Sequence, residues 1–243
     1  MARYNIELLT KSLIRRVEFN LYIPTLNLQG ALRSEKDYYQ NNVKKFPLLI
    51  LLHGFSDSYR GWQNNTHIEE LCDKYQVAAC FIGGDNRWYL DLGPLDNWYS
   101  FIESDLTDYL YGTFKNLDPA QPIVIGGASM GGYGALYHSI KENTKYSAAF
   151  ALSPAVKPDY LDESKFGSLR DLLLENKEKL VPTYLSIGSN DFIIKQSLEL
   201  DLWLQENNIG FRYKVCEGYD HSYKLWRLEI EHVFEFLKDH KII

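Results

Sequence analysis

The chain has 243 residues, and its formal net charge is −6, from 26 Lys and Arg against 32 Asp and Glu. This length fits one large α/β domain over residues 1–243 better than two small ones, since no linker, low-complexity tract or repeat divides it. The negative charge argues against nucleic-acid or anionic-membrane partners. The sequence contains no run of about 18 apolar residues, the length needed to span a bilayer.

The first residues, "MARYNIELLTKSLIRRVEF" (1–19), lack the apolar core and small-residue cleavage site of a signal peptide, so we expect a cytoplasmic protein. Cys72, Cys80 and Cys216 form no CxxC pair and are expected to be reduced core thiols. The six histidines show no HExxH or similar ligand spacing, so no metal site is expected.

Segments that predict strands alternate along the chain with segments of helical periodicity. The first, "RRVEFNLYIP" (15–24), alternates in character and suits an antiparallel edge strand. Almost wholly apolar runs follow, as expected of parallel strands covered on both faces. They lie at 46–54, 77–84, 122–129, 147–154, 182–191 and 211–219.

Helices are predicted around 102–110, 130–143 and 226–237, where apolar residues recur on one helical face. Strands alternating with helices indicate a mostly parallel sheet with helices on both faces. In such sheets, ligands bind beyond the carboxyl ends of the strands. The long stretch at 155–181 has two readings that the sequence leaves open: a small cap over the site, or a crossover helix with a long lead-in.

Ser129 lies in "GASMG" (127–131), which fits the G-x-S-x-G pattern. A predicted buried strand precedes the pattern and a predicted helix follows it, which is the context of a nucleophilic serine. A strand that turns straight into a helix strains the residue at the bend, and glycine on either side avoids collisions. The hydroxyl then lies at a helix N-terminus, where negative charge is favoured. The alternative is a serine that merely caps the helix.

A serine nucleophile needs a base and an acid that orients the base. In this fold class the acid follows the serine in the sequence, and the histidine follows the acid. Four histidines lie downstream of Ser129: His138, His221, His232 and His240. His138 is on the helix directly after the serine and is expected to point away. Only His221, in "GYDHSYKLW", lies between a predicted strand and a helix, so it is the expected base.

The expected acid is Asp191, which ends a strand in "SIGSNDFI". Asp220 is adjacent to His221 in sequence and badly placed to reach Nδ1 of the same ring, and Glu217 is a weaker competitor. The structural alternative for Asp191 is an N-cap of the helix near 192–207.

A tetrahedral intermediate also needs hydrogen-bond donors for its oxyanion. One is expected to be the backbone N–H of Met130, directly after the nucleophile. The other is expected to be the N–H of Phe55, in the loop that follows the strand "LLILLHG". His53 in that loop is interpreted as a hydrogen-bonding anchor and not as a second base.

With these residues in place, the sequence resembles the esterase D / tributyrin esterase group of α/β-hydrolases. Its relatives include S-formylglutathione hydrolases, feruloyl esterases and mycolyltransferases. The resemblance covers most of the chain and rests on five stretches. They are "LLHGFSDSYRGW" (51–62), "GGDNRWYLD" (83–91), "GGASMGGYGALY" (126–137), "GSNDF" (188–192) and "DHSYKLWRLEIEHVFEFL" (220–237).

The resemblance implies an α/β-hydrolase fold, a Ser129–Asp191–His221 triad, an oxyanion hole from Phe55 and Met130, and no cofactor. It is compatible with a homo-oligomer. The sequence departs from many relatives in the residues around His221 and in a shorter cap segment, which suggests an open site for short acyl groups. Trp88 and Tyr89 follow a predicted strand end, so they are expected to line the substrate pocket.

Four functions follow from these patterns. The leading hypothesis is a serine carboxylesterase acting on short-acyl esters, such as acetylated sugars or small xenobiotic esters. An acyltransferase and an S-formylglutathione-type thioesterase would use the same triad. The non-enzyme alternative is a binding or assembly protein on a retained hydrolase fold, although such a protein has no physical need for a complete Ser, Asp and His set.

Overall fold

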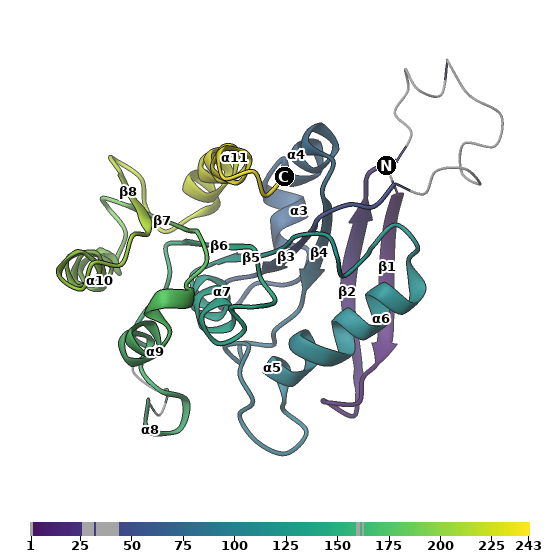
Figure 1. Ribbon diagram of the computed structural model, residues 1–243, viewed down its shortest axis with the longest axis horizontal. Helices are drawn as coiled ribbons and strands as arrows, with labels where there is room; N and C mark the ends of the chain where they lie inside the picture. Colours follow the sequence, from purple (N-terminus) through teal and green to yellow (C-terminus); the bar gives the residue numbers. More distant parts are fainter. Residues whose placement is uncertain (1, 26–31, 33–43, 159–160, 162) are drawn as a thin grey trace.

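An eight-stranded sheet of order β1-β2-β4-β3-β5-β6-β7-β8 forms the centre of the computed structural model (Figure 1). The structure describes residues 2–25, 32, 44–158, 161 and 163–243. β1 and β2 pair antiparallel, as do β2 and β4, and every other neighbouring pair is parallel. The strands are β1 (Ala2–Leu9), β2 (Arg16–Ile23), β3 (Leu48–Leu52), β4 (Ala78–Ile82), β5 (Ile123–Ala128), β6 (Ala148–Leu152), β7 (Thr183–Gly188) and β8 (Arg212–Cys216).

The six predicted parallel strands are confirmed as β3 to β8, but the prediction of the antiparallel edge was wrong in one respect. β2 is antiparallel, yet it is the second strand, and β1 forms the edge. β1 was missed because most of its side chains are exposed and only Ile6 is buried. A strand with so little buried surface has almost no hydrophobic alternation to read.

Helices cover both faces of the sheet, as predicted. Alternate residues of β3 enter different cores: Leu48, Ile50 and Leu52 face one, and Leu49 and Leu51 face the other. The first core is covered by η1, α6 and α7, and the second by α4 and α11 (Figure 1). The helices are α3 (Gly61–Asn65), α4 (Ile68–Tyr75), α5 (Trp98–Ser100), the π-helical turn η1 (Phe101–Leu106), α6 (Thr107–Thr113), α7 (Met130–Lys141), α8 (Glu163–Phe166), α9 (Leu169–Glu175), the 3-10 turn η2 (Lys177–Lys179), α10 (Ile194–Glu206) and α11 (Tyr223–Asp239).

The stretch 155–181 contains two short helices, α8 and α9, while residues 159, 160 and 162 lie outside the described residues. Leu169 and Leu173 of α9 are buried in the core next to α7. The second half of the stretch therefore packs as a crossover helix. Whether the stretch also forms a cap stays a prediction.

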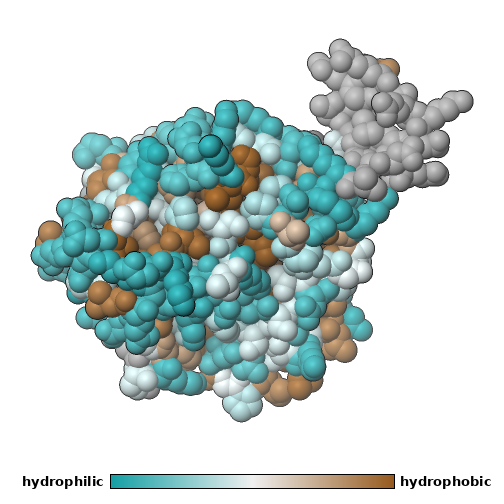
Figure 2. All heavy atoms as spheres, in the orientation of Figure 1, coloured by the Kyte–Doolittle hydropathy of each residue, from teal (hydrophilic) through white to brown (hydrophobic). Residues whose placement is uncertain are grey.

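The surface in Figure 2 is mainly hydrophilic, with small scattered hydrophobic patches. Among the described residues, no helix combines the length and apolar character needed to cross a bilayer. Cys72, Cys80 and Cys216 are free and buried, which confirms the prediction of reduced core thiols.

The largely buried carboxylate of Glu103, on η1, joins this turn to α7 and to the segment that follows α7. It forms an ion pair with His138 Nδ1, a second with Lys145 at 2.7 Å, and accepts a hydrogen bond from Tyr146 at 2.6 Å. His138 is fully buried and its Nε2 lies 2.8 Å from the Tyr89 carbonyl oxygen, so both ring nitrogens are engaged and it is not available as the base. Burial by itself would raise the pKa of Glu103, but His138 and Lys145 outweigh it and lower the pKa to about 2.

Glu103 makes the stability of the fold sensitive to acid. Its folded pKa of about 2 is below the ordinary value of 4.5, so its contribution is fully present above about pH 4.5 and is lost as the pH falls towards 2. Glu103→Gln should lower the free energy of unfolding at neutral pH by about 3 kcal/mol, because His138 and Lys145 lose their buried counter-charge. Urea unfolding of both proteins at pH 7, 5 and 3 checks this, and the gap between them should narrow at pH 3.

The exposed Glu175 at the end of α9 provides the control. Glu175→Gln should change the free energy of unfolding by less than about 0.5 kcal/mol at each pH. A constant gap between wild type and Glu103→Gln at all three pH values would contradict the assignment.

Candidate active site

Ser129 stands at the turn where β5 passes directly into α7. Its φ of 54° and ψ of −116° are strained for a residue with a side chain. A Cβ on Gly127 would collide with the backbone of Gly131, and a Cβ on Gly131 would collide with the carbonyl of Leu52. Both glycines are therefore required for the turn to approach β3 so closely.

The turn is fixed by backbone hydrogen bonds and leaves the serine side chain out of the capping role. The Ser129 N–H donates to Leu152 O at 2.9 Å, and the Ser129 carbonyl accepts from Tyr133 N at 3.0 Å. Its side chain makes no capping hydrogen bond to α7. The half-buried hydroxyl thus lies at the N-terminus of a 12-residue helix, whose first N–H groups favour negative charge.

Asp191 and His221 follow neighbouring strands, β7 and β8, and meet beyond their carboxyl ends. His221 Nδ1 lies 2.8 Å from Asp191 Oδ2, and the Asp191 side chain is fully buried. The other carboxylate oxygen accepts from Ile193 N at 3.0 Å, so Asp191 also fixes the start of the turn before α10. A buried carboxylate bonded to Nδ1 holds the imidazole in one orientation with Nε2 free to act.

Backbone contacts between the two loops explain why this pair forms. Asn190 N donates to Tyr219 O at 2.9 Å, and Ser189 N donates to Cys216 O at 2.9 Å. A Cβ on Gly188 would collide with the carbonyl of Tyr219, so this glycine allows the close approach.

The competing acid, Asp220, is exposed and accepts a hydrogen bond from the Ser222 hydroxyl. Its carboxylate is thus engaged with the start of α11. The structure pairs His221 with Asp191, in the arrangement that sequence position had suggested.

Trp226 of α11 links the histidine to the serine turn. Its ring stands edge-on to His221, with 5.3 Å between ring centroids, and its Nε1 donates to Ser153 Oγ at 3.2 Å. A Cβ built on Gly54 would lie 4.0 Å from Trp226 Cη2 and 3.4 Å from Ser129 Cβ. Gly54, Ser129 and Trp226 therefore meet at one place, and His221 contacts the same indole ring.

The loop after β3 is anchored by His53, which is 2% exposed. Gly84 N–H donates to His53 Nε2 at 3.0 Å, so Nδ1 carries the proton and donates to Gly54 O at 2.7 Å. Burial lowers the pKa of His53, which agrees with this neutral form. The prediction that His53 is an anchor is confirmed, and the loop that carries the Phe55 N–H is held in place.

The structure places Trp88 and Tyr89 differently from the expected pocket lining. Tyr89 is fully buried, and its hydroxyl donates to His53 O at 2.9 Å, beneath the loop. Trp88 is 5% exposed, and its ring packs edge-on against Tyr133. Both residues have positive φ, and their rings are buried in the interior and do not line an open pocket.

Sequence reasoning missed Phe192, which is 79% exposed beside the candidate site. Its ring centroid lies 4.6 Å from that of His221. The ring of Phe55 is also exposed, at 51%. The signal that could have found Phe192 is its position directly after Asp191 in the sequence.

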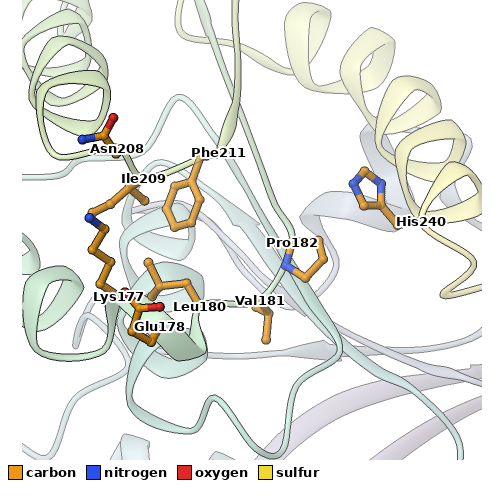
Figure 3. A pocket seen from close by; sticks show the side chains of 10 residues that line it. Lys177, Glu178, Leu180, Val181, Pro182, Asn208, Ile209, Phe211 and His240 are labelled. Atoms are coloured by element: carbon orange, nitrogen blue, oxygen red, sulfur yellow. The ribbon is translucent and has the colours of Figure 1, made fainter.

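Other hollows lie elsewhere on the molecule. The one in Figure 3, of about 440 Å³, is lined by Leu180, Pro182, Phe211 and His240 among others, and contains none of the candidate residues. It lies where β7 and β8 begin, at the sheet edge opposite to the candidate site. Within the described part of the chain, no group of three or more His, Cys, Asp or Glu side chains is arranged to hold a metal ion.

Comparison with known proteins agrees with this geometry. The family model described as "Putative esterase" matches residues 35–240. The chain belongs to this esterase family. An acetyl esterase of Caldicellulosiruptor saccharolyticus is 28% identical over 233 residues, covering 84% of this chain and 86% of that protein. The chain is therefore that of an enzyme of the esterase class, and the expected family resemblance is confirmed.

Solved structures of esterases share the fold. The fluorophosphonate-binding serine hydrolase F of Staphylococcus aureus matches with a TM-score of 0.81 and 19% identity, covering 97% of this chain and 98% of that chain. An S-formylglutathione hydrolase from Agrobacterium tumefaciens matches with a TM-score of 0.76 and 17% identity, covering 97% and 94%. A ferulic acid esterase matches with a TM-score of 0.81 and 17% identity, covering 100% and 98%. These matches confirm the α/β-hydrolase fold.

Asp191, which is bonded to His221, and Asp220, which precedes His221 in the sequence, give a direct test of the pairing. Asp191→Asn should lower kcat on p-nitrophenyl acetate by about 10³- to 10⁴-fold, because an amide no longer holds the imidazole in the required tautomer. Asp220→Asn should change kcat less than about threefold, since Asp220 bonds to Ser222 instead. Equal losses, or a larger loss for Asp220→Asn, would show that the acid has been assigned wrongly.

Proposed function

We propose that the protein is a serine carboxylesterase that hydrolyses short-acyl esters. Ser129 is the nucleophile, His221 the general base and Asp191 the group that orients the imidazole. The backbone N–H groups of Phe55 and Met130 form the oxyanion hole. The observation that carries the proposal is the Asp191–His221 hydrogen bond of 2.8 Å at the same sheet edge as the strained Ser129 turn.

The reaction proceeds through an acyl-enzyme. His221 Nε2 takes the hydroxyl proton as Ser129 Oγ attacks the ester carbonyl, and the two N–H groups stabilise the oxyanion. The intermediate collapses, the ester C–O bond breaks, and the imidazolium gives its proton to the leaving alcohol. Water then attacks the carbonyl of the acyl-enzyme while His221 takes a proton from it. The bond to Ser129 Oγ breaks, His221 returns the proton to Oγ, and the carboxylic acid leaves.

One comparison supports a short acyl group on a small ester as the substrate. The curated relative with 28% identity is an acetyl esterase. Acetylated sugars and small xenobiotic esters belong to this class. A single domain over 1–243, a cytoplasmic location and the oligomeric state remain predictions from the sequence.

Labelling with a fluorophosphonate probe tests the catalytic proposal. Wild type should react rapidly and Ser129→Ala should not react, because only an activated serine attacks the phosphorus. Asp220→Asn is the matched control and should react like wild type. Absence of labelling in a folded wild-type protein would favour the alternative of a binding protein on a hydrolase fold.

The alternatives on the same triad differ in the acceptor or the leaving group. An acyltransferase passes the acyl group to a sugar or thiol, so product analysis with such an acceptor present distinguishes it from a hydrolase. Relative rates on S-formylglutathione and p-nitrophenyl acetate rank the thioesterase reading.

Phe192 is expected to contact the bound ester, because its exposed ring lies against His221. Phe192→Ala should raise KM for phenyl acetate about two- to tenfold while changing KM for ethyl acetate much less, since ring stacking contributes about 0.5–1.5 kcal/mol. Steady-state kinetics on both esters measures this. Leu202→Ala, at an exposed apolar position on α10, is the control and should change neither value. An equal change for both esters would contradict the contact.

A further inference from the structure

A hydrogen bond joins two loops of the candidate site that are far apart in the sequence. Tyr223, the first residue of α11, donates from its hydroxyl to Asp57 Oδ2 at 2.5 Å, across a separation of 166 residues. Tyr223 lies two positions after His221, and Asp57 lies two positions after Phe55. Among the described residues, this is the one hydrogen bond that directly joins 53–58 with 219–226.

Asp57 is itself fixed within the loop after β3. Its N–H donates to Gly54 O at 3.2 Å, and its Oδ1 accepts from Ser58 N at 2.8 Å. The carboxylate therefore moves with the backbone of Gly54 and Phe55. A displacement of the Asp57 carboxylate would therefore also displace the Phe55 N–H, which is the proposed oxyanion donor.

The pair is packed tightly from below. A Cβ on Gly61 would collide both with the Asp57 carboxylate and with the Tyr223 hydroxyl, so a side chain there would have to displace one or both of them. The Tyr223 ring stands edge-on to Trp62 at 5.9 Å and to Trp226 at 4.8 Å between ring centroids. Trp62 Nε1 in turn donates to Leu52 O at 3.0 Å, at the end of β3.

Tyr223 keeps its hydroxyl proton near neutral pH and can donate it. Burial and the hydrogen bond to the Asp57 carboxylate both raise the pKa of its hydroxyl. The bond from a neutral phenol to a carboxylate is charge-assisted, and such bonds are shorter and stronger than neutral ones.

We propose that the Tyr223–Asp57 hydrogen bond sets the position of His221 relative to the Phe55 N–H. Tyr223 and Asp57 are therefore positioning residues. The inference rests on the proposed function, because it requires His221 and Phe55 N–H to act on one carbonyl. The His221 imidazole must transfer protons between the Ser129 hydroxyl and the leaving alcohol while the Phe55 N–H binds the oxyanion of the same carbonyl. The two loops come from opposite ends of the chain, and the Tyr223–Asp57 bond holds them in register.

Tyr223→Phe removes the hydroxyl and keeps the ring. It should lower kcat on p-nitrophenyl acetate at least about tenfold with KM within about twofold, because small displacements of catalytic groups reach 10²-fold losses. Tyr184→Phe is the matched control. It removes a similar bond, from Tyr184 Oη to Glu229 Oε2 at 2.7 Å, which also joins α11 to the sheet. The control should lose stability but keep its kcat.

Asp57→Asn and the double variant test whether the two residues act through one bond. Asp57→Asn keeps the fold and removes the charge, so it should lower kcat less than Tyr223→Phe. The double variant should lose no more than about twofold beyond Tyr223→Phe, as expected for partners in one interaction. Multiplied losses would overturn the proposal. If Tyr223→Phe does not fold, as judged by thermal unfolding, the test passes to Asp57→Asn. A lowered kcat for Asp57→Asn then supports the proposal, and an unchanged kcat overturns it.

Fluorophosphonate labelling separates this proposal from the proposed function. A wild type that is not labelled ends both. A labelled wild type with Tyr223→Phe labelled at the same rate, and with an unchanged kcat, overturns the positioning role alone. A slower labelling rate for Tyr223→Phe than for Tyr184→Phe supports it.

Discussion

The contact between the β5–α7 turn and the end of β3 is the constraint on which the candidate site depends. Gly131 lies directly against the Leu52 carbonyl, and Gly127 lies directly against Gly131. This contact forces Ser129 into its strained conformation and brings the helix N-terminus next to the loop that carries Phe55. A larger residue at either glycine would push the turn away from the end of β3, so the Ser129 turn and the loop that carries Phe55 depend on the same contact.

Much of this arrangement could be predicted from the sequence. Wholly apolar strands can be recognised in the sequence because both of their faces are buried. The ends of these strands then place Ser129, Asp191 and His221 at the carboxyl ends of the parallel strands. The choice between Asp191 and Asp220 also followed from local chain geometry. These inferences succeed because they need only the direction of strands and the neighbours of each residue in the chain.

Other features depend on contacts that sequence order does not encode. Tyr89 follows a strand end, yet its segment folds inward and the hydroxyl bonds to the His53 carbonyl. β1 pairs along its whole length but buries too little apolar surface to be visible as a strand. The Tyr223–Asp57 bond crosses most of the chain, so only the three-dimensional structure reveals it.

The three thiols have a consequence for how this protein meets oxidants and alkylating reagents. Burial raises the pKa of Cys72 and of Cys80, and it raises that of Cys216 to about 12. Thiolates, which are the reactive form, are therefore scarce at neutral pH. Peroxide and iodoacetamide should therefore react slowly with these cysteines while the chain is folded. The rate of alkylation can then report on unfolding without modifying Ser129.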